Sequence, residues 1–479
     1  MSDEKTIAEA SAKSSSENAV HELAPPLNYV YKLDLRLIPI LGATYTILFL
    51  DRTNSMSITL LIVALRANSL NMPSNGYNTC LWIFFIPFVL IEIPSNMIMG
   101  LPRVKPNVFL GLNMLVLGVI ATCQGLTHTY GGLLALRFLM GIFEATLPAG
   151  AAYLIGEYYT RRESALRFAM FFTFGILGPC ISGLLAFAIR NMDGINGKEG
   201  WRWIFILEGL VTIAISSLVF LIVPNFPEKS HFLSPAEKTH LLDKLRRDKG
   251  DQKLSLKHVN WIKVLSDYRI WFPTLMFFCC DMTAASMSSF IPTILTELGW
   301  KAAKAQVMSI PIWATGIVSQ LFACWVSGRI GWRFPFVLLG ITFATIGWII
   351  QNVYCNERGL APGVRYFSLF SMSMGTFIQM AMLTSWMTNN LRGRASIGVG
   401  TAIILGLGNC ANFVASNVFI KTEAPFYPTG FRTGLGLTIV GAGICLVYVA
   451  LLWWHNKKLD RKRKQVGGED DQVEYRYQY

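Results

Sequence analysis

The sequence predicts an all-α polytopic membrane protein with twelve transmembrane helices arranged as two six-helix bundles. Hydrophobic residues make up 53% of its 479 positions and charged residues only 15%. Soluble domains carry about 25% charged residues. Twelve apolar stretches run along the chain, and one long basic link separates the first six from the last six.

Each apolar stretch is long enough for a helix to cross a bilayer, which takes about 20 residues. In chain order they cover 37–62, 78–100, 107–126, 131–156, 166–189, 202–223, 271–295, 306–328, 335–354, 364–387, 397–420 and 433–454. The predicted domains are a disordered cytosolic leader (1–35), an N-terminal bundle (36–223), a linker (224–269), a C-terminal bundle (270–455) and a cytosolic tail (456–479).

The formal net charge of +13 does not indicate a nucleic-acid partner, because the basic residues gather in short links and in the tail at 457–464. Basic links alternate with links that carry few basic residues. The positive-inside rule therefore predicts that both termini are cytoplasmic. We expect a multi-pass protein of the plasma membrane, with an organelle membrane as the alternative.

The polar groups give no sign of an enzyme. Most of the nine cysteines lie inside apolar stretches, where they behave as small core residues and form neither a disulfide framework nor a CxxC metal site. The chain also lacks a metal-ligand spacing and a nucleophile beside a base. The sequence thus predicts no enzyme activity, no metal and no cofactor.

The linker 224–269 is predicted to contain one short amphipathic helix. Ser234 and Glu237 have the spacing of a capping box, and Pro235 stands at the first helical position. A solvated charged helix without a regulatory role is the simpler interpretation, and a regulatory role is the alternative.

Two charge pairs lie inside predicted spans: Asp51 with Arg52, and Arg137 with Glu144. Ionisable residues within a span are costly and usually functional. Arg137 and Glu144 are two helical turns apart and share one face. A salt-bridge network that only holds helices together is the alternative, although buried pairs often fail to repay their desolvation.

The layout and several motifs resemble a known family. Two six-helix halves joined by a basic loop, together with the basic motif at 325–333, resemble the major facilitator superfamily, whose substrate site lies at mid-membrane between the halves. Four further segments resemble its anion:cation symporter family, in the fungal branch of allantoate, nicotinate and pantothenate permeases. These segments are 50–54, 84–96, 137–145 and 201–209.

The resemblance implies that Arg52 and Arg137 face an organic carboxylate, and that Asp51 and Glu144 take up and release protons. An arginine fork matches a carboxylate, and Asp or Glu can be neutralised by a proton. We therefore expect a proton-coupled symporter that imports a small organic anion by alternating access and functions as a monomer. A facilitator or exporter of the same fold, or a non-transporting nutrient sensor, stays open.

Further substrate contacts are expected from Asn54, Phe88, Asp281, Trp386 and Asn409. Asp281 stands where the family more often has asparagine, and it lines the cavity or is a hydrogen-bonded core residue. Glu92 is expected to be a structural partner of the loop arginines. Met56 and Ser57 replace a Gly-Asn pair that the family usually has, so the substrate does not follow from the resemblance.

Overall fold

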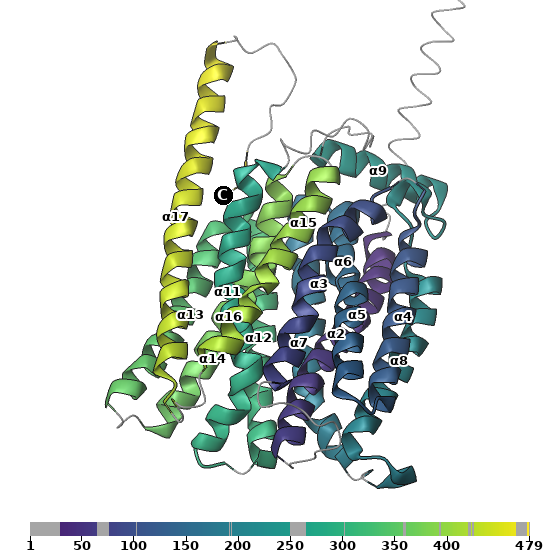
Figure 1. The fold of residues 1–479 in the computed structure, drawn as a ribbon. Coiled ribbons are helices and arrows are strands. Elements are labelled where there is room, and N and C mark those ends of the chain that lie inside the picture. Colours follow the sequence, from purple (N-terminus) through teal and green to yellow (C-terminus); the bar gives the residue numbers. More distant parts are fainter. Residues whose placement is uncertain are drawn as a thin grey trace, which may run out of the picture.

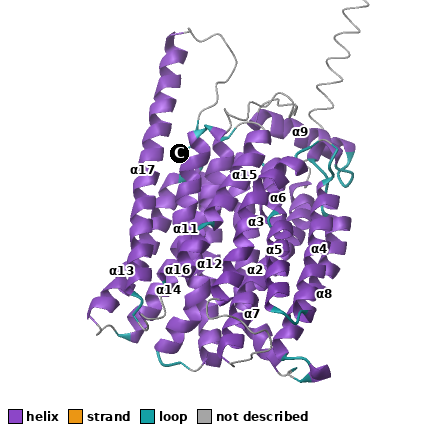
Figure 2. Cartoon of the chain, in the orientation of Figure 1, coloured by secondary structure: helices purple, strands orange, loops and turns teal. Residues whose placement is uncertain are grey.

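The computed structural model describes residues 29–64, 76–101, 103–190, 192, 194–249, 265–300, 302–357, 361–391, 394–419, 423, 426–465 and 477–478. Within these ranges the protein is helical, as Figure 2 shows. Twelve of the described helical stretches are long and apolar enough to cross a membrane. The predicted fold class is therefore confirmed.

The N-terminal half contains α2 (Tyr29–Ala64), α3 (Gly76–Met99), α4 (Pro106–Leu126), α5 (Tyr130–Glu144), α6 (Thr146–Tyr158), α7 (Arg161–Arg190) and α8 (Gly200–Ile222). The C-terminal half contains α11 (Tyr268–Glu297), α12 (Ala302–Ile330), α13 (Phe334–Glu357), α14 (Pro362–Asn390), α15 (Arg394–Asn409), α16 (Ala411–Val418) and α17 (Pro428–Gln465). The two halves lie beside each other in Figure 1, with α9 (Pro235–Lys249) across one end. We call this end the linker side and the opposite end the far side.

Two of the predicted spans are each built from two helices. The stretch 131–156 is interrupted at Ala145, between α5 and α6. Pro148 lacks the N–H that would bond the carbonyl of Glu144, which accounts for the break there. The stretch 397–420 is interrupted at Cys410, between α15 and α16.

Helix α2 begins at Tyr29, earlier than the predicted residue 37, and charged residues occupy its first turns. Arg167 binds Asp34 through two bonds, Nε to Oδ1 at 3.1 Å and Nη2 to Oδ2 at 2.6 Å. Lys32 Nζ lies 2.6 Å from Glu237 Oε1. These partners let α2 continue past its apolar part on the linker side.

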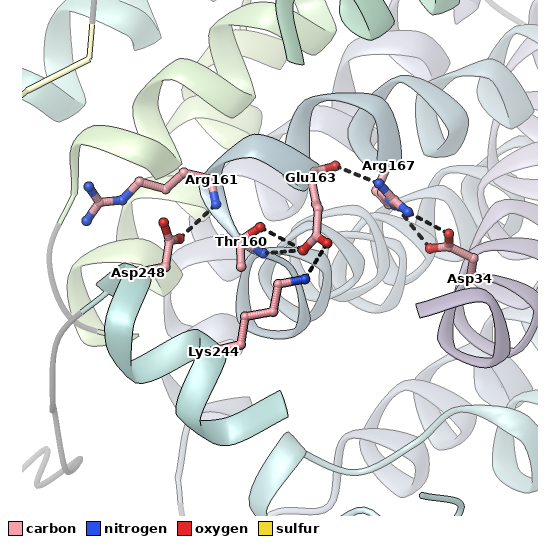
Figure 3. A network of polar contacts seen from close by, with 7 residues as sticks. All are labelled: Asp34, Thr160, Arg161, Glu163, Arg167, Lys244 and Asp248. Atoms are coloured by element: carbon pink, nitrogen blue, oxygen red, sulfur yellow. Dashed lines mark hydrogen bonds and ion pairs between the residues drawn. The ribbon is translucent and has the colours of Figure 1, made fainter. Parts of the chain in front are cut away.

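The predicted capping box of α9 is confirmed. The Ser234 N–H donates to Glu237 Oε2 at 2.9 Å, and the Glu237 N–H donates to Ser234 Oγ at 3.3 Å. Helix α9 is also anchored to α7 (Figure 3): Lys244 Nζ lies 2.6 Å from Glu163 Oε1, and the Arg161 N–H donates to Asp248 Oδ2 at 2.8 Å. It is therefore packed against the bundle and not merely solvated.

The two halves contact each other on the linker side. The backbone carbonyl of Arg161, at the start of α7, accepts bonds from Asn389 Nδ2 at 3.1 Å and Arg333 Nη2 at 2.9 Å. Ser164 Oγ donates to Asn389 Oδ1 at 3.1 Å and contacts Ser385 Oγ at 3.2 Å. Arg333 belongs to the basic motif at 325–333, so this motif connects helix ends of the two halves.

Candidate functional site

A cavity lies between the two halves, with about 1130 Å³ of empty space including its open part. Its wall combines polar groups with many aromatic rings, as small-molecule sites usually do. The N-terminal half contributes residues of α2, α3, α5 and α7, and the C-terminal half contributes residues of α11, α12, α14, α15 and α16. Ionisable or amide side chains in this wall are Arg52, Arg137, Asp281, Asn409 and Asn412.

Arg52 is the most fully engaged charged group of the cavity. Its Nε donates to Glu144 Oε1 at 2.5 Å, and its Nη1 donates to Asn409 Oδ1 at 3.3 Å. Its guanidinium carbon lies 4.7 Å from the ring centre of Phe88, a cation–π distance. The Arg52 side chain is 17% exposed and that of Glu144 is 0% exposed. Arg52 thus joins a buried carboxylate of one half to an amide of the other.

Glu144 ends helix α5, which places it two turns from Arg137 on one helix face. Its second oxygen, Oε2, is buried and has no hydrogen-bond partner among the described residues. Arg137 lines the cavity, with its guanidinium carbon 5.4 Å from the ring centre of Phe205. Asp51 is buried on α2, directly before Arg52 in the chain.

Asp281 lines the cavity from α11 and is also buried, so it has features of both interpretations of this residue. Its Oδ2 accepts a bond from Asn412 Nδ2 at 3.1 Å. Sequence reasoning did not include Asn412. Its signal was available, because Asn409 and Asn412 are three residues apart and such residues share a helix face.

Two expected substrate contacts lie outside the cavity wall, and a third is not described. Phe88 is fully buried beneath Arg52 and does not line the cavity in this arrangement. The Trp386 indole is fully buried on the linker side, where Nε1 donates to the backbone oxygen of Gln478 at 2.9 Å. Direct contact of either residue with a substrate stays a prediction. The side chain of Asn54 lies outside the described residues, as do those of Met56 and Ser57.

Glu92 does not pair with the loop arginines, contrary to expectation. Its side chain is 0% exposed, and neither carboxyl oxygen has a hydrogen-bond partner among the described residues. It faces α15 of the other half: a Cβ added at Gly406 would lie 2.7 Å from Glu92 Oε2. The absence of a side chain at Gly406 gives this carboxyl its space.

The described residues contain no group of three or more His, Cys, Asp or Glu side chains that could hold a metal ion. The chemistry that the cavity offers is that of two arginines, three nearby carboxyl groups and two amides. Such a set can bind an anion and hold protons.

Two helical halves with a cavity between them, in a chain with twelve candidate spans, define a multi-pass membrane transporter. The chain belongs to the Major Facilitator Superfamily, whose sequence model matches residues 44–416.

Named relatives agree with this class. The uncharacterized transporter C11D3.18C of Schizosaccharomyces pombe is 30% identical over 435 residues, which cover 90% of this chain and 84% of the relative. The high-affinity nicotinic acid transporter of Saccharomyces cerevisiae is 27% identical over 434 residues, covering 89% and 78%. Among solved structures, the proton:xylose symporter XylE has a TM-score of 0.67 at 15% identity, covering 86% of this chain and 94% of its own, which shows the shared fold.

Proposed function

We propose that the protein is a proton-coupled symporter of the anion:cation type that imports a small organic anion. The main support for this proposal is the position of Arg52. It lines the cavity while bound to the buried Glu144 and to Asn409 of the other half. A proton on Glu144 weakens its hold on Arg52 and frees the guanidinium fork for a substrate carboxylate. Arg137 supplies the second positive charge.

The balance of charges supports proton coupling. Arg52 and Arg137 supply two positive charges, and Asp51, Glu144 and Asp281 supply three negative charges when ionised. A bound monoanion would raise the excess to two negative charges in a water-poor site, where uncompensated charge is costly. Uptake of protons by the carboxyl groups restores the balance, so anion and proton binding should favour each other.

Asp281 supports a more specific substrate. It carries negative charge or accepting oxygens on the C-terminal wall, whereas both arginines belong to the N-terminal half. A substrate with a carboxylate and a nitrogen donor would satisfy both walls. Nicotinate, the cargo named for one relative, has the carboxylate but a ring nitrogen that accepts at neutral pH, so it is a reasonable first ligand to test the arginine wall.

The basic links support an orientation with the linker side in the cytoplasm, and we propose the plasma membrane as the location. With that orientation the contacts of Arg161, Ser164, Asn389 and Arg333 close the cytoplasmic path. The cavity is then loaded from outside, and import requires those contacts to open.

The test is uptake of a panel of labelled carboxylates, nicotinate included, into proteoliposomes with an imposed pH gradient. We expect one or more to accumulate above equilibrium only when the gradient is present. Accumulation without a gradient effect would indicate a facilitator. The absence of both binding and uptake across the panel would contradict the organic-anion proposal.

The Glu144→Gln variant tests whether Glu144 couples proton movement to substrate accumulation. Glutamine cannot exchange a proton, so we expect uphill accumulation to be lost while exchange of substrate between the two sides continues. Gradient-driven accumulation by this variant would show that Glu144 is not the coupling group. Glu163→Gln, a glutamate that binds α9 on the linker side, is the matched control.

A further inference from the structure

A second binding site lies on the linker side, remote from the cavity, and a segment of the chain itself occupies it. Tyr477 and Gln478 lie against α11, α14, α17 and the turn at Gly331. The function proposed above gives this site no role.

Two asparagines of the C-terminal half bind the backbone of this segment in the same way. Asn456 Nδ2 donates to the Tyr477 oxygen and the Tyr477 N–H donates to Asn456 Oδ1, both at 3.0 Å. Asn390 Nδ2 donates to the Gln478 oxygen at 3.0 Å and accepts the Gln478 N–H at 2.8 Å. Paired amide contacts of this kind hold an extended backbone whatever its side chains are.

The side chains add selectivity. Arg269 Nη1 donates to the Tyr477 hydroxyl at 2.8 Å, and the His455 ring packs edge-on at 5.1 Å. Gln478 Oε1 accepts from Asn389 Nδ2 at 2.7 Å, and Gln478 Nε2 donates to the Gly331 oxygen at 2.5 Å. The site therefore distinguishes an aromatic residue followed by a glutamine.

The polar groups of the site are buried and depend on the segment. Asn390, Asn456 and Trp386 are 0%, 1% and 0% exposed. The Trp386 indole N–H donates to the backbone oxygen of Gln478 at 2.9 Å. Buried donors and acceptors are costly when unpaired, so these three side chains are built to hold an occupant.

The site shares residues with the contact between the halves. Asn389 donates to Gln478 Oε1 and to the Arg161 carbonyl of the other half, and its own oxygen accepts from Ser164. Gln478 thus sets the orientation in which the Asn389 amide can bridge the halves. Gly331, its second side-chain partner, lies two residues before Arg333, which also binds the Arg161 carbonyl.

We propose that this is a binding site for a short extended peptide segment, and that its occupation by Tyr477 and Gln478 holds the two halves together on the linker side. Release of the segment frees Asn389 and favours opening of that side. The proposal uses only the transporter class and the alternation of access between sides. It does not depend on the substrate or on proton coupling.

The test is hydrogen–deuterium exchange of the full-length protein in lipid nanodiscs, followed at residues 161–165 and 385–391. Gln478→Ala removes two side-chain hydrogen bonds, and Tyr477→Ala removes the hydroxyl bond to the charged Arg269 and the ring contact with His455. For each variant we expect exchange on the order of tenfold faster, because such losses shift a local opening by about that factor. Lys458→Ala, an exposed change on α17, is the control and should match the wild type.

A second measurement tests whether the faster exchange results from loss of the bound segment and not from a local effect of the substituted side chain. A variant that ends at residue 465 receives a synthetic peptide with the sequence of residues 471–479, or the same peptide with alanine at positions 477 and 478. We expect the first peptide to restore slow exchange at 161–165 and the second to have no effect. Unchanged exchange in both point variants, or equal effects of the two peptides, would overturn the proposal.

Discussion

Two buried glutamates of the N-terminal half have very different surroundings, although both lie inside apolar spans. Glu144 is bound by Arg52, whereas Glu92 has no hydrogen-bond partner among the described residues and faces Gly406. A charge without a partner is expensive to bury. We therefore expect the Glu92 carboxyl to be neutral in this conformation and the Glu144 carboxyl to be ionised.

Because of this difference, replacing glutamate by glutamine should affect stability differently at the two positions. Glu92→Gln replaces one neutral group by another and should change the free energy of unfolding by less than about 1 kcal/mol. Glu144→Gln removes the counter-charge of Arg52 and should cost about 1.5–3 kcal/mol, the range for hydrogen bonds to charged groups. Thermal unfolding of both variants in one detergent measures the difference. Equal shifts would show that Glu92 is not neutral.

Asp281 leads to a prediction about selectivity. Two ligands that differ by one amino group, such as butyrate and 4-aminobutyrate, can be compared for binding to the wild type and to Asp281→Asn. If Asp281 receives the nitrogen donor, its replacement should reduce the preference for the amino compound roughly tenfold, or about 1.4 kcal/mol. Ser288→Ala, a neutral change in the same wall, is the control. A preference that survives in Asp281→Asn would remove this residue from recognition.

The sequence could identify single residues better than their partners. The cost of charge in a span singled out Arg52, Arg137 and Asp281, and all three line the cavity. The hydrophobic period of a helix does not show which side chains of other segments pack against it. For that reason the positions of Phe88 beneath Arg52 and of Trp386 beside Gln478 could not be derived.

At the scale of elements, apolar length predicted all twelve spans, and the deviations at their ends have identifiable causes. The extra turns at the start of α2 depend on long-range ion pairs, such as that of Arg167 with Asp34. The neighbouring sequence does not predict such distant partners. The cap of α9, by contrast, depends on residues three positions apart and was therefore predictable.

The cap of α9 is expected to be measurable. Ser234→Ala removes the acceptor of the Glu237 N–H and should cost about 1 kcal/mol of helix stability. Hydrogen exchange in residues 235–249 should become roughly fivefold faster. Thr239→Ala is the control, because its hydroxyl bonds only the Pro235 carbonyl of the same helix and is exposed. Equal exchange in both variants would exclude a role for the cap.

The docking of α9 also has an expected dependence on pH. The hydrogen bond from Lys32 and the backbone N–H of Ser234 lower the pKa of Glu237 below its usual value. Burial acts to lower the pKa of Lys244, but its bond to Glu163 outweighs this and raises the pKa. Glu237 contributes fully to the docking of α9 at pH values above the ordinary glutamate pKa. This contribution is lost as the pH falls through the lowered pKa of Glu237. The Lys244 contribution is lost only at strongly alkaline pH, so α9 should stay docked throughout the neutral range.

At the scale of the whole molecule, the two halves contact each other through few polar groups on the linker side. The carbonyl of Arg161 collects bonds from Arg333 and Asn389, while its N–H binds Asp248 of α9. One backbone unit thus connects the linker helix, the N-terminal half and the C-terminal half. Loss of one of these hydrogen bonds should shift the balance between closed and open arrangements of the two halves, and it should not unfold the protein.

Arg333→Met tests this balance, since methionine keeps much of the side-chain volume but cannot donate to the Arg161 carbonyl. The loss of a charge-assisted bond, about 1.5–3 kcal/mol, should raise the open population by roughly 10- to 100-fold. Spin labels attached through unnatural amino acids at the exposed positions 103 and 329 report the distance between the halves by electron resonance. We expect Arg333→Met to add a population of longer distances, and Lys304→Met, an exposed change on the far side, to leave the wild-type distribution. Identical distributions in all three proteins would mean that the Arg333 bond does not hold the halves together.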